Sequence, residues 1–319
     1  CQLGYRSVTT HLDAFQKLDI SIHKNENSVS LEAPKYHSRH YDLWLIEASV
    51  SATLNTTLYA VGKGLSVCIK DAACEPHVVE VLNLLTRMGA SINGIGTNEL
   101  SIEPRKSLLK PAEFTAGPDY VDIAGTIAAT AVTGGNITIH NANQPSIVGG
   151  LCQWFNAFGV DISFCKSKML VNAPEKLKIA PEFLPQAGPE LPKLAVRPWP
   201  GFPVDVLPVM VTLACKSTGS ILFQNWMYES GFDYVRELNY LGAEILTADP
   251  HRIIIREKSI NFHGGEIAAP RIIQGTKAIF LAAIADPVET TIHGVNILRR
   301  RYPEIFETYK NLGVIIEYE

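Results

Sequence analysis

The chain repeats one short motif at a nearly constant spacing. Each copy is an apolar residue followed by Gly or Asp, two further residues and Ile, and the copies begin at Leu18-Asp19, Met88-Gly89, Phe158-Gly159, Leu241-Gly242 and Leu312-Gly313. The Gly or Asp positions are separated by 70, 70, 83 and 71 residues. This period is too long for a solenoid unit and suits one small α/β unit. Duplicated α/β units tend to form two lobes around a cleft, which is a common place for a ligand.

The copy from about Pro118 to Asn172 shows the order of elements most clearly. The predicted elements are a short strand at Tyr120–Asp122, a buried helix at Ile123–Val132, a strand at Asn136–His140, a helix from Pro145 to Phe158, and strands at Val160–Phe164 and Met169–Val171. Gly134 is a suitable residue for the left-handed end of the first helix. Pro145 suits the first position of the second helix, where a missing N–H costs nothing. The predicted unit is therefore β-α-β-α-β-β.

The same order recurs along the chain, in copies at Leu43–Glu103, Val204–Arg256 and Arg271–Glu319. Val314–Ile316 is the third strand expected of the last copy. The first copy is incomplete, with one helix near Thr9–Leu18 and two strands after it. The Pro-rich stretch Ala173–Pro200 is predicted to be an ordered linker loop. We expect a domain boundary near Gly117-Pro118, which gives domains at residues 1–117 and 118–319.

Composition limits the class of function. The chain is 46% hydrophobic and 19% charged with a net charge of −4, which is typical of a globular protein and argues against general binding to nucleic acid or to a membrane surface. Six cysteines without CxxC spacing indicate neither a zinc site nor a disulfide framework, so a cytoplasmic protein is expected. Walker, GxGxxG and HExxH motifs are absent, so we expect no metal or organic cofactor.

Six sequence segments resemble the enolpyruvyl transferase family, and within it the transferases that act on UDP-N-acetylglucosamine. They are Cys1-x-x-Gly4-x-Arg6-x-Val8-x-x-His11, Ser49-Val50-x-Ala52-Thr53, Ala72-Ala73-x-Glu75-Pro76, Pro118-Asp119, Pro200-Gly201-Phe202-Pro203-x-Asp205 and Arg300-x-Tyr302. The resemblance implies a two-domain α/β fold, an inside-out α/β barrel with three β-α-β-α-β-β units per domain. Residues 1–117 would then be part of the sugar-nucleotide-binding domain and 118–319 the second domain. It also implies an N-terminal fragment, located on another chain or lost by cleavage.

The resemblance implies transfer of an enolpyruvyl group from phosphoenolpyruvate to the 3-hydroxyl of UDP-N-acetylglucosamine, in peptidoglycan precursor synthesis. By position, Cys1 would be the proton donor or covalent partner of phosphoenolpyruvate. Asp205 would lie near the attacking hydroxyl, and Arg300 would bind phosphoenolpyruvate. Each also has an ordinary interpretation: a terminal or buried cysteine, a helix N-cap before Val206–Leu213, and a solvated arginine at a helix entrance.

The resemblance also implies a set of substrate-binding residues, which are Arg6, Ser7, Val8, Thr9, Thr10, His11, Ser49, Val50, Ser51 and Met227. Arg6 would contact substrate phosphate, and the segment from Ser7 to His11 would hold the uracil ring. The turn from Ser49 to Ser51 would direct backbone N–H groups at a diphosphate. Met227 would make an apolar contact to the sugar nucleotide, although it could equally be a core residue.

Several positions depart from the family pattern. Tyr120, Gly231 and Gln274 stand where the family usually has Arg, and Glu47 stands where it has Lys. A lost bidentate Arg contact costs roughly 1.5–3 kcal/mol at an anion site. These departures support an alternative, a catalytically degenerate paralogue that binds a nucleotide sugar or a protein partner without turnover. RNA-end processing and shikimate-directed transfer are weaker alternatives that rest on the fold.

Overall fold

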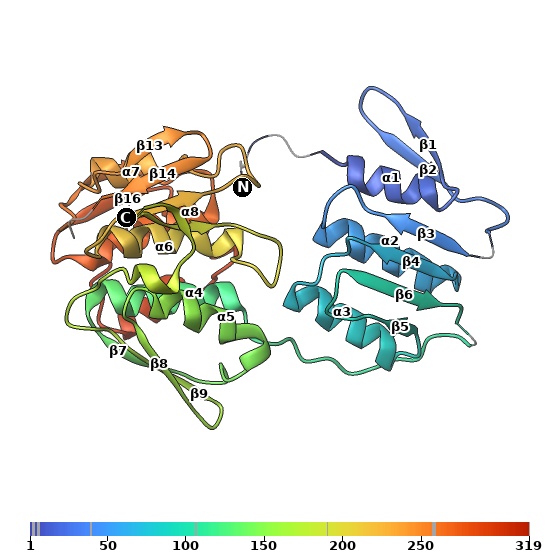
Figure 1. Cartoon of the computed structure of the whole chain (residues 1–319), viewed down its shortest axis with the longest axis horizontal. Coiled ribbons are helices and arrows are strands. Elements are labelled where there is room, and N and C mark those ends of the chain that lie inside the picture. Colours follow the sequence, from blue (N-terminus) through green and yellow to red (C-terminus); the bar gives the residue numbers. More distant parts are fainter. Residues whose placement is uncertain are drawn as a thin grey trace. The chain divides into compact units, whose positions relative to one another are not determined.

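The computed structural model describes residues 1–319 except Gln2, Leu3, Tyr5, Arg6, Arg39, Lys106, Glu190, Glu257, Lys258, Ser259 and Glu319. The chain forms two compact units (Figure 1). The large unit contains Cys1–Tyr5, Pro118–Arg197 and Gly201–Glu319, and the small unit contains Arg6–Gly117 and Pro198–Pro200. The assignment of these units as the two domains of a sugar-nucleotide enzyme stays a prediction.

The repeated motif marks the C-terminal end of a helix. Asp19, Gly89, Gly159, Gly242 and Gly313 all have positive φ, between 62° and 108°. In every copy the N–H of the next residue returns to a carbonyl five positions earlier, as in Ala90 to Leu85 and Val314 to Tyr309. This left-handed ending with a six-to-one hydrogen bond is the Schellman arrangement, which favours Gly or a residue such as Asp. The period in the sequence is thus a period of helix endings.

Among the described residues, the small unit contains one complete repeat and part of another. Its helices are α1 (Thr9–Lys17), α2 (Val50–Lys63) and α3 (Pro76–Arg87), and its strands are β1 (Ser21–Lys24), β2 (Val29–Glu32), β3 (Tyr41–Trp44), β4 (Val67–Lys70), β5 (Ser91–Asn93) and β6 (Glu99–Glu103). The sheet order β3-β4-β6-β5 pairs β3 and β4 in parallel and the other neighbours antiparallel. Leu43, Ile69 and Leu100 place the apolar face of this sheet in the core.

Helices occupy the centre of the large unit, and three of them pack on one another. The helices are α4 (Tyr120–Thr133), α5 (Pro145–Asn156), α6 (Leu207–Cys215), α7 (Val235–Tyr240), α8 (Ile273–Ala285) and α9 (Ile305–Asn311), with 3-10 turns η1 (Pro181–Phe183), η2 (Val204–Val206) and η3 (Val295–Arg300). Helices α4, α6 and α8 pack on one another, and every residue of α6 is buried. A helix that is apolar on all sides needs such a surrounding.

The described strands of the large unit form three separate sheets. They are β7 (Asn136–Ile139) with β9 (Lys168–Asn172) and β8 (Asp161–Cys165); β10 (Gln186–Gly188), β11 (Leu191–Ala195), β12 (Ile221–Gln224), β14 (Arg252–Ile255) and β13 (Leu246–Asp249); and β15 (Gly265–Ala268) with β16 (Thr290–His293). The β11–β12 and β15–β16 pairs are parallel, and β9 and β14 are antiparallel to their neighbours. The described strands form no closed barrel.

Three predictions of local structure are wrong. The expected strand at Tyr120–Asp122 is the first turn of α4, because Asp119 accepts hydrogen bonds from the N–H groups of Val121 and Asp122. The expected linker at Ala173–Pro200 contains strands β10 and β11. The expected strand at Val314–Ile316 does not form, since no described strand lies beside it to complete a ladder.

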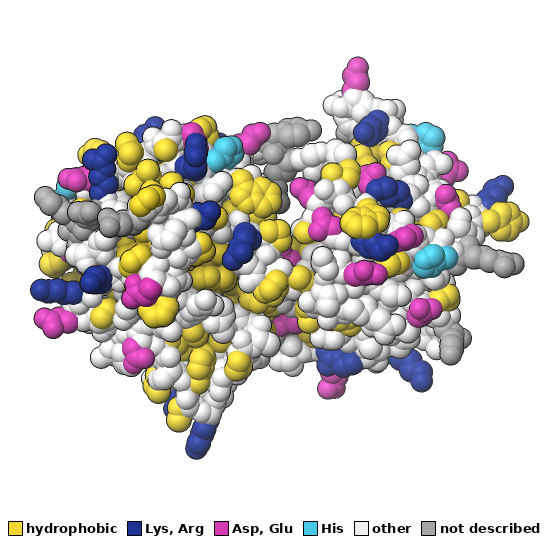
Figure 2. Space-filling model, in the orientation of Figure 1, with side chains coloured by type: hydrophobic (Ala, Val, Ile, Leu, Met, Phe, Trp, Pro, Cys, Tyr) yellow, Lys and Arg dark blue, Asp and Glu magenta, His cyan; other side chains and the backbone are white. Residues whose placement is uncertain are grey.

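The surface fits the expected charge balance. Figure 2 shows basic and acidic side chains interleaved on the visible face of the small unit, so neither sign forms a continuous field there. Within the described part of the chain, every helix is too short or too polar to span a bilayer.

Candidate functional site

Charged side chains from four elements meet in the large unit, and we call Asp119, Asp122, Asp205, Lys277 and Arg301 the charged cluster. Arg301 Nη2 lies 2.9 and 3.0 Å from the two carboxylate oxygens of Asp119, and Arg301 Nη1 lies 3.7 Å from Asp205 Oδ2. Burial acts to lower the pKa of Arg301, but the nearby Asp119, Tyr302 and Asp205 outweigh it and raise that pKa. The guanidinium thus bridges two carboxylates, one from the start of α4 and one from η2.

Lys277 is the most buried member of the charged cluster, with a side chain 1% exposed. Its Nζ lies 3.1 Å from Asp122 Oδ1 and 3.9 Å from the centre of the Tyr302 ring. Burial lowers the pKa of Lys277, and the attraction of Asp122 opposes that shift. Gly125 leaves room for the lysine, because a Cβ there would lie 2.6 Å from Lys277 Cε.

Cys1 lies at the N-terminus of α8. Its Sγ accepts a hydrogen bond of 3.3 Å from the backbone N–H of Ile273, a residue 272 positions away in sequence. The thiol is exposed. The N-terminal N–H groups of a helix form an arrangement that binds anions, so an anion bound here would lie beside the Cys1 sulfur.

The other predicted residues of the large unit occupy distinct places. Asp205 lies in η2 with a side chain 41% exposed, and the N-cap of α6 is Val206 rather than Asp205. Arg300 is the exposed last residue of η3, and Arg301 is the neighbour that pairs with the carboxylates. Met227 is half-buried and donates its backbone N–H to Asn225 Oδ1 at 3.2 Å.

Two of the positions that lack the family arginine have roles in packing. A Cβ at Gly231 would lie 2.2 Å from Asn225 Nδ2, so an arginine would clash unless Asn225 moved. Gln274 is buried, and its Oε1 accepts a hydrogen bond of 3.2 Å from the Tyr302 hydroxyl. The third, Tyr120, begins α4 and is 9% exposed.

The predicted nucleotide-binding residues of the small unit form a second group, at the starts of α1 and α2. His11 Nε2 lies 3.1 Å from Ser51 Oγ, and His11 Nδ1 lies 3.1 Å from Asn55 Nδ2. Thr10 is buried and donates to Glu47 Oε1 at 3.1 Å. Glu47 is therefore directed at α1.

Further predicted residues lie at the same two helix starts. Ser7 and Thr9 form a hydrogen bond at the exposed start of α1, and the side chain of Val8 is 57% exposed. Ser49 caps α2 by accepting the N–H of Ala52 at 3.3 Å, and Val50 is the first residue of α2. The remaining predicted contact, Arg6, lies outside the described residues.

Sequence reasoning did not select Lys277, Asp122 or Arg301 as candidate site residues. Lys277 had a usable signal, because it is the one charged residue of the α8 sequence IQGTKAIFLAAIA. A charge in a helix that is apolar on all sides needs a buried partner. For a metal, by contrast, the described residues contain no group of three or more His, Cys, Asp or Glu side chains placed to hold an ion.

Known proteins resemble the chain over nearly its whole length. The family profile described as EPSP synthase (3-phosphoshikimate 1-carboxyvinyltransferase) matches residues 1–309. A protein of Treponema denticola named UDP-N-acetylglucosamine 1-carboxyvinyltransferase is 34% identical over 316 residues, which is 99% of this chain and 71% of the relative. A protein of the same name from Borrelia garinii subsp. bavariensis is 30% identical over 315 residues, with the same coverage.

Solved structures share the fold at lower sequence identity. The enolpyruvyl transferase NikO from Streptomyces tendae has a TM-score of 0.81 at 19% identity, covering 98% of this chain and 72% of NikO. EPSP synthase from Acinetobacter baumannii has a TM-score of 0.69 at 16% identity, covering 99% of this chain and 73% of that structure. With the profile match and the 34% identical relative, these likenesses mean that the chain belongs to the EPSP synthase family of enolpyruvyl transferases.

Proposed function

We propose that the chain takes part in transferring the enolpyruvyl group of phosphoenolpyruvate to the 3-hydroxyl of UDP-N-acetylglucosamine. The observation that carries the proposal is the position of Cys1, whose sulfur accepts the N–H of Ile273 at the start of α8. The same unit contains Asp205 and Arg301, so a thiol, a carboxylate and a guanidinium belong to one folded body. The names of relatives that are 30–34% identical supply the substrates.

The proposed reaction is an addition followed by an elimination. The sugar hydroxyl oxygen bonds to C2 of phosphoenolpyruvate while its methylene carbon takes up a proton, for which the Cys1 thiol is the proposed donor. Asp205 is the proposed acceptor of the hydroxyl proton. The bond from C2 to the phosphate oxygen then breaks and the methyl carbon loses a proton, which restores the double bond and releases phosphate.

Cations are needed because both substrates are anions. Arg300 is exposed at the end of η3 and is the proposed contact to phosphoenolpyruvate. In the small unit, the α2 N-terminus presents Ser49 and Ser51, and backbone N–H groups at such a helix start favour a diphosphate. His11 beside Ser51 would add a donor to the same nucleotide.

A second candidate is binding without turnover. It is favoured by Gly231 and Gln274, which stand where the family has arginine. Gly231 packs against Asn225, and Gln274 accepts a hydrogen bond from the Tyr302 hydroxyl, so neither position supplies a cation. Fewer cations would weaken stabilisation of the phosphate that leaves, and this loss lowers the rate more than it lowers the affinity for the nucleotide.

The test uses the purified complete protein, including the N-terminal part that the resemblance implies, with phosphoenolpyruvate and UDP-N-acetylglucosamine. Release of inorganic phosphate and a sugar-nucleotide product of the expected mass are measured together, and calorimetry measures the binding of UDP-N-acetylglucosamine alone. The variants Cys1→Ser and Asp205→Asn should lower phosphate release by at least about 100-fold. Asp249→Asn is the matched control, since Asp249 is a carboxylate of β13 in the same unit, paired with Arg252.

Each outcome decides between the candidates. Phosphate release that falls in both site variants and persists in the control supports the transferase. Nucleotide binding without release supports the second candidate. A folded chain that neither binds the nucleotide nor releases phosphate rejects both.

A further inference from the structure

Asp119 is a carboxylate whose direction is set by a helix. It is the N-cap of α4, and its Oδ1 accepts the backbone N–H groups of Val121 at 2.9 Å and Asp122 at 3.3 Å. An N-cap carboxylate is held by the first turn of its helix and by the positive end of the helix dipole. The side chain of Asp119 is therefore a fixed negative charge at the start of α4.

Arg301 is anchored on this carboxylate. Its Nη2 donates to both oxygens of Asp119, at 2.9 and 3.0 Å. Its backbone N–H donates to the carbonyl of Leu298 at 3.1 Å, and Leu298 is buried. The guanidinium is a rigid plane, so holding the backbone and Nη2 also fixes the direction in which Nη1 points.

The contacts of Arg301 with its two carboxylates differ in length. Nη1 lies 3.7 Å from Asp205 Oδ2, which makes an ion pair without a direct hydrogen bond, whereas the short contacts go to Asp119. A carboxylate that accepts short charge-assisted hydrogen bonds is a weaker proton acceptor than one paired at longer range. The arrangement therefore suits Asp119 as the anchor and Asp205 as the base.

The backbone that carries Asp205 is also held in place. Phe202 is 1% exposed and packs edge-on against Trp154, with the ring centres 4.9 Å apart. The N–H of Val206 donates to the carbonyl of Pro203 at 3.1 Å, which closes the turn η2 around Asp205. The side chain of Asp205 is 41% exposed, so a substrate hydroxyl can reach its carboxylate.

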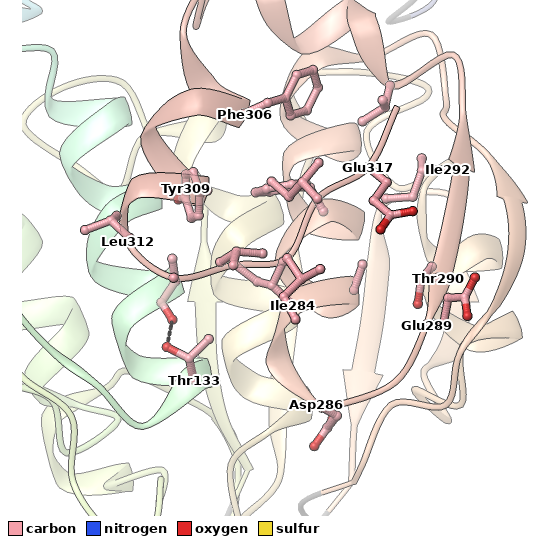
Figure 3. Close-up of a pocket in the computed structure, with 18 of the residues that line it drawn as sticks. Thr133, Ile284, Asp286, Glu289, Thr290, Ile292, Phe306, Tyr309, Leu312 and Glu317 are labelled. Carbon is pink, nitrogen blue, oxygen red and sulfur yellow. Dashed lines mark hydrogen bonds between the residues drawn. The ribbon is translucent and has the colours of Figure 1, made fainter. Parts of the chain in front are cut away.

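The pairing with Asp205 is separate from the groove between β16 and α9 (Figure 3). The close-up shows Ile292 and Phe306 on opposite sides of that groove. Arg299 lines the groove, with its Cζ 5.3 Å from the centre of the Phe306 ring, whereas Arg301 is not among the described residues that line it. Two arginines close in sequence thus have different surroundings, which provides a matched comparison.

We propose that Arg301 is the positioning residue for Asp205 in the transfer reaction. Its guanidinium, anchored on Asp119, holds the Asp205 carboxylate ionised and directed at the acceptor hydroxyl. This role depends on the proposed function, in which Asp205 accepts the proton of that hydroxyl. Arg301 itself takes up no proton, because an arginine stays protonated throughout. A lysine would not suffice, since a point charge lacks the planar fork that reaches two carboxylates.

Phosphate release by the complete protein is the first readout. Arg301→Gln and Arg301→Lys should each lower kcat by roughly 10- to 100-fold with little change in KM for either substrate, because a misplaced base slows the chemistry more than the binding. Arg299→Gln is the matched control and should leave kcat within about twofold. Urea unfolding establishes that each variant is folded under the assay conditions.

Two combinations separate positioning from a purely structural role. Asp119→Asn keeps an N-cap for α4 but removes the charge that anchors the guanidinium, so it should lower kcat by a factor similar to that of Arg301→Gln. In an Asp205→Asn background, Arg301→Gln should cause little further loss, because the residue that it positions is already neutralised. A structural defect would instead lower phosphate release by the same factor in both backgrounds.

A second readout does not need turnover. When carboxylates hold a guanidinium, rotation of its Nη groups slows and their N–H signals separate in NMR spectra. Separate Nη signals are expected for Arg301 in the parent, identified by their loss in Arg301→Gln, and they should merge in Asp119→Asn and shift in Asp205→Asn. A parent that shows these signals but releases no phosphate refutes the proposed function and leaves the pairing intact. Merged signals in an active parent refute the pairing alone.

Other results would also overturn the role of Arg301. They are an unchanged kcat in Arg301→Gln, a parental kcat in Arg301→Lys, and an equal fall in Arg299→Gln. A raised KM for phosphoenolpyruvate in place of a lowered kcat would make Arg301 a substrate contact. A higher kcat in Arg301→Gln would mean that the ion pair restrains the base, which is the opposite of positioning.

Discussion

The ion pair between Lys277 and Asp122 predicts opposite effects on stability when either partner is neutralised. Lys277 is 1% exposed and Asp122 is 52% exposed. Lys277→Met removes a desolvated ammonium and leaves a carboxylate that water can reach. The recovered desolvation cost is several kcal/mol, against about 1 kcal/mol for the lost ion pair and about 0.5–2 kcal/mol for the contact with the Tyr302 ring. The large unit should therefore be more stable, by about 1–3 kcal/mol.

The reverse change should destabilise the large unit. Asp122→Asn leaves the ammonium buried opposite a neutral amide, and a loss of about 1–3 kcal/mol is expected, below the usual range for a fully buried pair because Asp122 is half exposed. Urea unfolding followed by hydrogen exchange in α4 and α8 measures both effects, with the exposed Lys168→Met as control. If Lys277→Met proves destabilising by more than about 2 kcal/mol, the assumption that desolvation dominates is refuted. A stabilised variant with lower phosphate release would mean that the lysine is retained for function.

Three further predictions concern other groups of the large unit. Arg301→Ala should destabilise it by about 1–2 kcal/mol in urea unfolding, since Asp119 and Asp205 lose their shared partner, and an unchanged midpoint would contradict this. Burial raises the pKa of Cys215 from 9.0 to about 12, so its contribution to stability is present below pH 9 and is lost as the pH rises toward 12. Cys215→Ala should therefore flatten the decline between pH 9 and pH 11 in unfolding curves, and a decline as steep as in the parent would exclude this thiol as its cause. Tyr234→Phe removes a buried hydroxyl that has no hydrogen-bond partner among the described residues, so thermal unfolding should show a cost below about 1 kcal/mol or a gain.

Local chemistry made the repeat predictable. The Gly or Asp after each helix has positive φ, and this requirement is visible in the sequence because few residues adopt that conformation without cost. The start of the helix at Pro145 was predicted for the same kind of reason and is confirmed.

Two predictions from the sequence were wrong because the conformation depends on pairing with a distant strand. Strand β11 lies in a Pro-rich stretch that composition marks as a loop, and it forms because β12, about thirty residues later, offers a parallel edge. Val314–Ile316 has the sequence of a strand but no neighbour on its open side among the described strands. In both cases a partner distant in sequence decides the conformation.

The contacts of the candidate site also join residues that are distant in sequence. The contact between Cys1 and Ile273 joins residues 272 positions apart, and spacing along the chain does not indicate it. The resemblance to a family directed attention to Cys1, Asp205 and Arg300, whereas the pairing of Arg301 with two carboxylates needed coordinates.

Pro198–Pro200 belongs to the small unit, although the residues on either side of it belong to the large unit. This arrangement limits which fragments of the chain can be expressed separately. The carbonyl of Trp199 accepts a hydrogen bond from the Cys74 thiol at 3.1 Å, so a tripeptide encoded between two stretches of the large unit completes the smaller body. An expression fragment that stops at Gly117 would omit this piece and expose the surface that it covers. A fragment made to study the small unit alone therefore has to include Pro198–Pro200 as well as Arg6–Gly117.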